Sequence, residues 1–312
     1  LEALDVKGRE VIVPSFSFIG TANVVLMAGG MPVFADIEKD TLGLSPLSVE
    51  KKITNKTVAV MPMHYGGGAC NINELKSLCD NRDLILIEDA AESLGASVGS
   101  EKVGSFGKAA WFSFAQNKII STGEGGAIVT DDDLLYETCK LVRSHGRLET
   151  SNYFTSNDYF DYIRLGYNFR MSSINAALGK SQLDGIESNI NSRRRIASFY
   201  NDLFRGKKEF ELIRGLPDSH NVYQLYSVLL KKASNRNKLI SFLTENKVFS
   251  KVYFTPIHQT TFYSKLGYKD VDLEITCDIS DRIISLPIYP ELKISEQDKV
   301  IHNIKKFFNE KK

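Results

Sequence analysis

The sequence lacks long hydrophobic runs, paired cysteines and a strong excess of charge, and each absence argues against a class of function. No apolar stretch reaches the roughly 18 residues of a membrane span, and no charged-then-apolar leader opens the chain. The four cysteines form no CxxC pair and the five histidines no HExxH pattern, so neither a zinc cluster nor a disulfide framework is expected. The 39 basic and 38 acidic residues leave a net charge of +1, which favours neither nucleic acid nor an anionic membrane as partner. We therefore expect a cytoplasmic protein with a small ligand.

The length and composition fit an ordinary globular protein of about two domains. The 312 residues are 43% hydrophobic and 25% charged, and a typical domain holds roughly 150 residues. The opening stretch LEALDVKGREVIVP has no initiating Met and reads as the end of a helix, a turn at Gly8 and a strand. We therefore expect a further segment upstream of residue 1.

Short apolar runs alternate with helical patterns through the first half of the chain. The predicted strands are almost continuously apolar, as expected when helices cover both faces of a parallel sheet. This alternation predicts an α/β fold with a large, mostly parallel sheet between helices. The expected strands are 10–14, 31–36, 57–63, 83–89, 109–114 and 126–131, and the expected helices are 21–30, 72–82 and 134–146.

The second half has a different pattern. Residues 147–172 have no clear period and read as a long functional or intersubunit loop. A helical pattern then runs from 172 to 205 as a bridge between domains, with the arginines 193–195 on a solvated face. Strands at 222–230 and 247–254 and helices at 236–246 and 295–308 complete the chain. We predict a large domain over 1–195 and a smaller C-terminal α+β domain over 196–312.

A lysine stands between an apolar run and a glycine-rich turn in FSFAQNKIISTGEGGAIVTDD, residues 112–132. A partly desolvated lysine at the edge of a sheet has a lowered pKa and is a candidate amine nucleophile for Schiff-base chemistry. Ser113 precedes Lys118 by five residues and could bind a phosphate, while Gly123, Gly125 and Gly126 allow close backbone approach. The alternative is an ordinary surface lysine in a hairpin.

Asp89 ends an apolar strand in IEDAAES. Ligands of open α/β sheets bind at the carboxyl ends of the strands, where a carboxylate can hold a pyridine nitrogen protonated. The alternative is that Asp89 caps a following helix through its backbone amides.

Three further stretches carry candidate side chains. Phe18 follows a strand and could stack on a planar cofactor, although core packing is the more common use of a phenylalanine. His64 lies at another strand end, where local hydrogen bonding is the simpler explanation. Asn168 and Arg170 in GYNFRMS could form a polar clamp for phosphate or carboxylate, or belong to a structured loop.

Seven segments of the sequence form a recognisable ordered set. They are VIVPSFSFIGTAN, PVFADIEKDTL, IEDAAESLGA, VGSFG, FSFAQNKIISTGEGGAIVTDD, GYNFRMSSINAALGKSQL and SLPIYPEL. In this set and order the sequence resembles, over nearly its whole length, the DegT/StrS family of sugar-nucleotide aminotransferases. The resemblance implies a pyridoxal phosphate (PLP) enzyme of the aspartate aminotransferase fold, with a large PLP-binding domain and a smaller C-terminal one.

The resemblance assigns a role to each main candidate. Lys118 matches the family's Schiff-base lysine, Asp89 the partner of the pyridine nitrogen, and Ser113 a hydroxyl on the cofactor phosphate. Asn168 matches an asparagine that the family lends to the phosphate of the neighbouring subunit. The resemblance therefore implies a homodimer with shared active sites.

Three weaker matches and one departure complete the resemblance. Phe18 matches an aromatic position beside the cofactor ring, and Glu92 a position near its phenolic oxygen where relatives carry Gln, His or Glu. His258 matches a histidine near the sugar-nucleotide side of the cleft. The family's phosphate-cradling motif lies upstream of the strand that begins at Glu10, and only nine residues precede that strand here.

The function implied by the resemblance is transfer of an amino group from an amino acid, usually glutamate, to a nucleotide-linked keto sugar. The acceptor is expected to be a 4-keto-6-deoxyhexose, and the product to enter surface polysaccharide or glycan synthesis. Two rivals are a sugar dehydratase of the same family and a non-catalytic sensor or structural protein on the same fold. Dehydratases of the family have a histidine in place of the lysine, so Lys118 argues against the first. Lys118, Asp89 and Ser113 together argue against the second.

Overall fold

The centre of the protein is a six-stranded sheet, and the computed structural model describes residues 1–148, 155–157 and 159–309. The strand order is β2-β1-β3-β4-β7-β8, with β8 antiparallel to β7 and every other pair parallel. This arrangement confirms the α/β class with a mostly parallel sheet. The strands are β1 (Glu10–Pro14), β2 (Met31–Ala35), β3 (Thr57–Val60), β4 (Ile85–Asp89), β7 (Ala109–Ser113) and β8 (Gly126–Val129).

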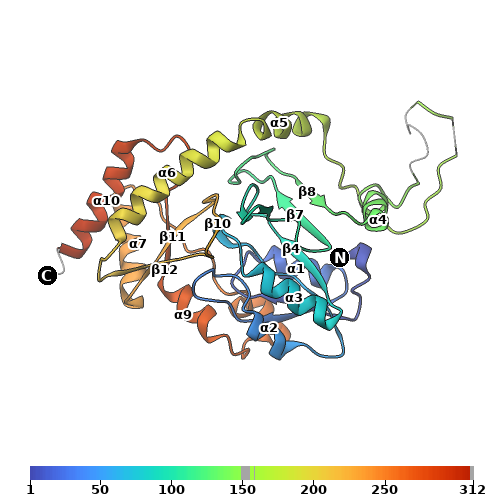
Figure 1. Cartoon of the computed structure of the whole chain (residues 1–312), viewed down its shortest axis with the longest axis horizontal. Helices are drawn as coiled ribbons and strands as arrows, with labels where there is room; N and C mark the ends of the chain where they lie inside the picture. The colour runs from blue at the N-terminus through green and yellow to red at the C-terminus, as the bar shows by residue number, and fades with distance from the viewer. Residues whose placement is uncertain (149–154, 158, 310–312) are drawn as a thin grey trace.

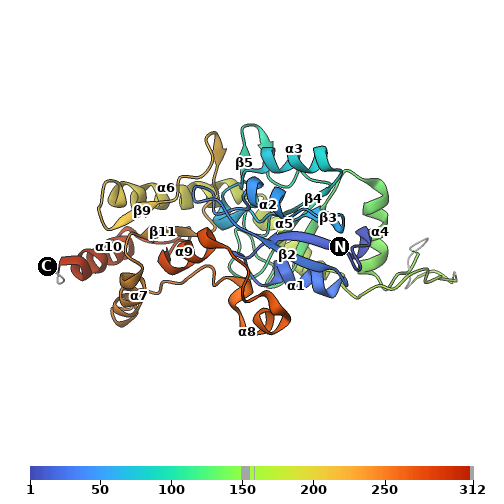
Figure 2. The ribbon, with the colours of Figure 1, turned by 90° about the horizontal axis from the view of Figure 1, so that it is seen from below.

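Helices cover both faces of this sheet because its strands are apolar on both sides. In β1, Val11 and Val13 pack into one buried cluster and Ile12 into another. The first cluster includes side chains of α1 (Gly20–Met27), and the second includes side chains of α2 (Pro46–Lys52) and α3 (Ile72–Arg82). Figure 2 shows α1 on one side of the sheet and α2 and α3 on the other.

The predicted helix over 172–205 is wrong in one respect: it is two helices, α5 (Ser173–Leu183) and α6 (Ile186–Phe204). Gly185 between them has φ −102° and ψ 7°, outside the helical region, so the chain changes direction there. The Ser172 side chain caps α5 by accepting the Asn175 N–H. Figure 1 shows α5 over the sheet and α6 running away from it toward the C-terminal part.

A second, three-stranded sheet of order β12-β11-β9 lies in the C-terminal part, with α6, α7 (Arg236–Glu245) and α10 (Ile294–Asn309) packed around it. Its strands are β9 (Phe210–Leu212), β11 (Tyr226–Leu230) and β12 (Ile283–Leu286). One buried cluster draws only on residues from Ile196 to Phe307. The chain between these strands returns to the large sheet, because Ile257, Tyr263 and Leu273 join the same cluster as α1.

The predicted strand over 247–254 is also wrong. This segment makes a single bridge, between Lys251 and Ser285, and is otherwise irregular. β12 and β9 occupy both edges of β11, and the segment meets the outer edge of β12 at this one residue pair. The helix α9 (Glu274–Arg282), which directly precedes β12, was not predicted from the sequence.

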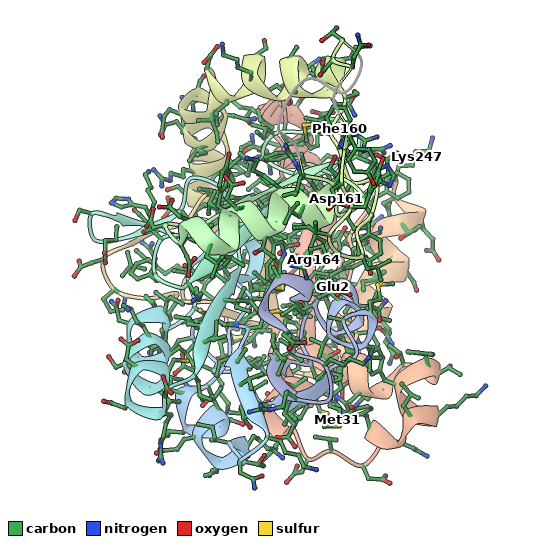
Figure 3. All side chains as sticks on the ribbon, turned by 90° about the vertical axis from the view of Figure 1, so that its right-hand side faces the viewer. Glu2, Met31, Phe160, Asp161, Arg164 and Lys247 are labelled. Carbon is green, nitrogen blue, oxygen red and sulfur yellow. The ribbon has the colours of Figure 1, made fainter. Side chains whose placement is uncertain are left out.

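Most of the predicted loop over 147–172 is described, while residues 149–154 and 158 lie outside the described residues. Figure 3 shows Arg164 of this loop beside Glu2, and its guanidinium donates to the Glu2 carbonyl at 3.2 Å. The Tyr167 hydroxyl contacts the Glu2 carboxylate at 3.2 Å. The loop therefore packs against the first residues of the chain. Within the described part of the chain, no helix combines the length and apolarity that crossing a bilayer requires.

Candidate active site

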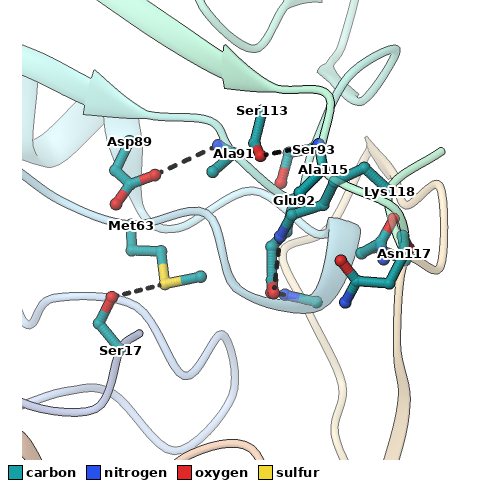
Figure 4. Close-up of polar contacts among 12 residues, drawn as sticks. Ser17, Met63, Asp89, Ala91, Glu92, Ser93, Ser113, Ala115, Asn117 and Lys118 are labelled. Atoms are coloured by element: carbon teal, nitrogen blue, oxygen red, sulfur yellow. Dashed lines mark hydrogen bonds and ion pairs between the residues drawn. The ribbon is translucent and has the colours of Figure 1, made fainter. Parts of the chain in front are cut away.

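Two adjacent parallel strands end at the same edge of the large sheet and carry the first two candidates. Asp89 is the last residue of β4 and Ser113 the last of β7, with Asp89 in register with Trp111. Lys118 lies in the loop between β7 and β8. Phe114 closes this loop, since its N–H donates to the Gly125 carbonyl and its carbonyl accepts the Thr122 N–H, both at 2.9 Å. Figure 4 shows Asp89, Ser113 and Lys118 together, near the ends of β4 and β7. The structure therefore brings three sequence-predicted residues to one sheet edge.

Asp89 is held by hydrogen bonds and almost fully buried. Its side chain accepts the Thr21 hydroxyl at 2.7 Å and the Ala91 N–H at 3.2 Å, and the residue is 4% exposed. The predicted helix-capping alternative has no helix to cap, since residues 90–96 form turns. Burial raises the pKa of Asp89 above its ordinary value, against the opposing effects of Thr21, Ala91 and Lys118. A cationic partner such as a protonated pyridine would relieve this cost.

Behind Thr21 the network continues through residues that sequence reasoning missed. The Ser17 hydroxyl lies 2.6 Å from the Thr21 hydroxyl. It also donates to the Met63 sulfur at 2.9 Å (Figure 4). Thr21 gives its only hydroxyl proton to Asp89, and Ser17 has a single hydroxyl proton for its two neighbours, the Met63 sulfur and the Thr21 oxygen. Residues that follow β1 and β3 thus fix the carboxylate at the end of β4.

Lys118 pairs with Glu92 inside the protein. The ammonium Nζ lies 3.4 Å from Oε1 of Glu92, and the two side chains are 14% and 4% exposed. The other carboxylate oxygen accepts the Gly66 N–H at 2.9 Å. Burial raises the pKa of Glu92, while Lys118 and the Gly66 amide act to lower it. The surface-lysine alternative is therefore wrong, since this amine is partly desolvated and faces a buried carboxylate.

Ser113 and the glycines border the same loop. The Ser113 hydroxyl accepts the Ala115 N–H at 3.4 Å, and the residue is half-buried. Gly123 and Gly125 have φ of +82° and +151°, so the turn after Lys118 uses backbone conformations that other residues rarely adopt. No group of three or more His, Cys, Asp or Glu suited to a metal ion occurs within the described ranges.

Two candidates lie apart from this group in the structure. Phe18 is 63% exposed, in the segment between β1 and α1. Asn168 is exposed and pairs through its backbone with Ser144, and its side chain has no hydrogen-bond partner among the residues described. Arg170 donates to the Ser144 hydroxyl at 3.4 Å. Within one chain, neither Phe18 nor Asn168 forms a polar contact with Asp89 or Lys118.

Both candidate histidines are buried in hydrogen-bond networks. The His64 ring accepts the Cys70 N–H at 3.2 Å, and its Nε2 lies 3.0 Å from Glu88. Local hydrogen bonding thus accounts for His64. His258 is 2% exposed, with Nδ1 2.7 Å from the Ser15 hydroxyl, and burial lowers its pKa. Its expected place near a sugar nucleotide remains a prediction.

Comparison with known proteins identifies the family. Residues 1–305 match the sequence profile of the DegT/DnrJ/EryC1/StrS aminotransferase family. The chain is 35% identical to GDP-perosamine synthase of Vibrio cholerae over 305 residues, covering 97% of this chain and 81% of that protein. The structure of PseC from Helicobacter pylori, an aminotransferase in pseudoaminic acid biosynthesis, superposes with a TM-score of 0.91 at 31% identity, covering 97% of this chain and 81% of PseC.

A further structure, a Streptococcus pneumoniae protein solved in its PLP form, shares the fold with a TM-score of 0.90 at 24% identity, over 99% of this chain and 83% of that one. The profile match spans nearly the whole chain, and the site brings a partly buried lysine and a buried aspartate to one sheet edge. The chain belongs to the DegT/DnrJ/EryC1/StrS aminotransferase family.

Proposed function

We propose that this protein uses PLP to move an amino group from an amino acid, with glutamate as the expected donor, to a nucleotide-linked keto sugar. The expected acceptor is a 4-keto-6-deoxyhexose, for the synthesis of a surface polysaccharide or glycan. The observation that carries the proposal is that a partly buried Lys118 and a buried Asp89 lie at the same edge of the large sheet. Family membership supports the same reaction class.

The donor set of the site fits PLP. Asp89 offers a buried carboxylate for a pyridine nitrogen, Lys118 an amine for an aldehyde, and Ser113 a hydroxyl for a phosphate. Glu92 lies next to the lysine and would face the ring's phenolic oxygen in this arrangement. The exposed ring of Phe18 is available to cover the face of a flat cofactor.

The protein's own residues would then manage protons and position. Bound PLP supplies an electron sink that makes the Cα proton of an attached amino acid acidic. Asp89, through its carboxylate, would hold the proton on the pyridine nitrogen. Lys118 Nζ would first attach the cofactor and, once freed, take the Cα proton as general base and return it as general acid. Glu92, 3.4 Å from Nζ, would orient the amine between these two tasks.

An absorption spectrum with added PLP, recorded before and after glutamate, tests the proposal. We expect a visible band that borohydride abolishes, with the cofactor mass fixed on the Lys118 peptide, and conversion of the band by glutamate. Lys118→Ala should form no adduct, and its rate of amino transfer should fall by about 10⁴-fold or more. Lys108→Ala, which removes a lysine that is 43% exposed and paired with Asp132, is the matched control and should behave as wild type.

The acceptor is then identified by following 2-oxoglutarate release with GDP-linked and UDP-linked keto sugars. Release that depends on one of them supports the proposal and names the nucleotide. A Lys118 adduct that forms while no nucleotide-linked keto sugar is turned over would overturn the acceptor class, and absence of any adduct would overturn the aminotransferase proposal.

We also propose a homodimer in which Asn168 serves the partner's site. Exposed apolar side chains gather on β8, α4 (Asp133–Arg143), α5 and the loop that precedes α5, which lie along one side of the molecule in Figure 1. Such a large apolar surface favours a protein partner. The side chains include Ile128, Leu134, Tyr136, Tyr159, Leu165, Phe169, Ile174 and Leu178. The exposed Asn168 lies within this surface.

A mixing experiment tests the shared site. Lys118→Ala and Asn168→Ala dimers, each impaired alone, are unfolded together and refolded so that subunits exchange. Random pairing makes half of the dimers mixed, each with one intact site, so about a quarter of the wild-type activity should return. Lys118→Ala mixed with Asp89→Asn should recover none, because both residues belong to the same chain's site. Equal recovery in the two mixtures, or in neither while mixed dimers form, would contradict sharing.

We further propose the domain division near 195, with residues 1–195 binding PLP and 196–312 forming the smaller domain. The cluster confined to residues 196–307 supports this division. Residues 257–273 belong to the second half of the chain but are an exception to this division, because three of their side chains pack with the large sheet.

A further inference from the structure

The loop that carries Lys118 is bound by three side-chain carboxamides from outside the large sheet. Asn189 of α6 donates from Nδ2 to the carbonyl of Ile119 at 2.8 Å. Gln224, just before β11, donates from Nε2 to the carbonyl of Asn117. These two carbonyls belong to the residues on either side of Lys118, so the main chain is hydrogen-bonded to an outside side chain both before and after the lysine.

Gln182 of α5 holds the same loop three residues further on. Its Oε1 accepts the Ser121 N–H at 3.0 Å, and its Nε2 donates to the Ser121 carbonyl at 2.5 Å. Gln182, Asn189 and Gln224 therefore bond to the main chain at three points between Asn117 and Ser121. We call these three side chains the carboxamide clamp.

Stability alone does not explain two members of the clamp. Gln224 is 3% exposed, Asn189 is half-buried, and the Oε1 of Gln224 and the Oδ1 of Asn189 are buried without a hydrogen-bond partner among the described residues. A buried amide oxygen that lacks a partner is unfavourable, and an apolar side chain of similar shape would avoid it. Among the residues that the structure describes, each of these two side chains makes one hydrogen bond, the one to the lysine loop.

The clamp also links the lysine to the C-terminal part of the chain. Arg193 of α6 is 6% exposed and donates from Nη1 to the carbonyls of Tyr223, Gln224 and Ile288, at 3.2, 3.4 and 3.1 Å. The segment that bears Gln224 is therefore anchored to α6 and to the turn after β12. A shift of this segment would reach Lys118 through the carbonyl of Asn117.

We propose that Gln182, Asn189 and Gln224 are positioning residues that fix the main chain around Lys118 and so hold its amine beside Glu92. The importance of that amine rests on the proposed function, whereas the clamp itself can be tested in the protein without cofactor. None of the three needs to touch the substrate to act. Their loss should loosen the lysine loop while the sheet and Asp89 stay in place.

The experiment uses the cofactor-free full chain and two local readouts. Hydrogen exchange of the peptide covering 117–122 reports the loop, and the rate of acylation of Lys118, followed by peptide mass spectrometry, reports its amine. For Asn189→Leu and Gln224→Met, we expect exchange in that peptide to quicken about tenfold. Lys118, 14% exposed when clamped, should acylate roughly three- to tenfold faster.

Asn303→Leu is the matched control. Asn303 is 6% exposed and also donates from a carboxamide to a main-chain carbonyl, that of Lys299 within α10. Figure 1 shows α10 well away from β7 and β8, the strands that the Lys118 loop connects. Asn303→Leu should leave both the hydrogen-exchange rate of the peptide 117–122 and the acylation rate of Lys118 unchanged. If Asn303→Leu raises the exchange rate and the acylation rate as much as the clamp variants do, the effect is general destabilisation and the proposal fails.

Gln182→Met guards against variants that do not fold, because Gln182 is only half-buried and its helix is exposed on the far side. It should quicken exchange at Ser121 and Thr122 by about threefold or more. Unchanged exchange and acylation in every folded clamp variant would overturn the proposal. If both readouts respond although the wild type transfers no amino group, the clamp stands and the proposed function falls.

Discussion

The two ends of the candidate site are built in different ways. Asp89 lies at a strand end, 4% exposed, and is fixed by Thr21 and Ala91 from the same sheet edge. Lys118 lies on a loop and is kept in place by side chains from α5, α6 and the segment before β11. We call Asp89 with its partners the acid end and Lys118 with its loop the amine end. The acid end is built by the large sheet and the segments that directly follow its strands, including the first turn of α1, whereas the amine end depends on α5, α6 and the segment before β11.

The surroundings of the two ends differ as well. The Asp89 network is closed by buried Ser17 and Met63. The Lys118 loop leads into β8, where Ile128 is 61% exposed, and borders the surface that we propose as a dimer interface. Catalytic groups held by a rigid scaffold keep their geometry, whereas loops adapt to ligands and partners. The acid end should therefore respond mainly to changes of charge, and the amine end to changes of its anchors.

The largest expected effect at the acid end comes from Asp89→Asn. The amide keeps the shape of the side chain but cannot hold a proton on a pyridine nitrogen by charge, so amino transfer should fall by about 10²- to 10³-fold. Steady-state rates with glutamate as donor measure this. The borohydride-fixed mass on Lys118 should persist, because the amine end is built separately. Loss of that mass together with activity would contradict the independence of the two ends.

A smaller effect is expected from Thr21→Val, which removes the hydroxyl that donates to Asp89 at 2.7 Å. The valine keeps the shape, and a lost hydrogen bond to a charged group should lower amino transfer roughly tenfold. Thr41→Val is the control, since Thr41 is 5% exposed and its hydroxyl donates at 3.2 Å to Glu38, a carboxylate outside the site. Similar losses in the two variants would mean that Thr21 matters for folding and not for Asp89.

The acid end was also the more predictable of the two from sequence. Continuous apolar runs fixed the strands, and a residue at the end of a buried strand in an open α/β sheet lies where ligands bind. Asp89 and Ser113 could therefore be placed by local pattern alone. Lys118 could be singled out by its context and by family resemblance, but its pairing with Glu92 joins residues 26 positions apart, which no local pattern reveals.

The anchors of the amine end could not be predicted, for the same reason. Gln182, Asn189 and Gln224 bind the loop across 61, 70 and 107 positions of sequence, and their residue types are common on solvated helix faces. The arginine run 193–195 gave a false signal of solvation, because Arg193 is buried against three carbonyls. The break at Gly185 was likewise hidden by apolar spacing that continues from α5 into α6.

The smallest expected effect, a change in stability, separates function from folding at Asp89. Burial raises the pKa of this carboxyl in the folded protein, so the native state binds its proton more tightly than the unfolded chain does. The contribution of Asp89 to stability is therefore fully present below its unfolded pKa of about 3.9 and is lost as the pH rises through the higher folded value. At neutral pH the buried charge of Asp89 destabilises the cofactor-free protein, and Asp89→Asn would remove that charge.

We expect this variant to melt roughly 1–3 °C higher than wild type near pH 7.5, and the difference to shrink as the pH falls toward 4. Thermal melts of both proteins across this range measure it, and a cofactor-free variant that melts lower than wild type near pH 7.5 would show that the hydrogen bonds from Thr21 and Ala91 outweigh the cost of the buried charge.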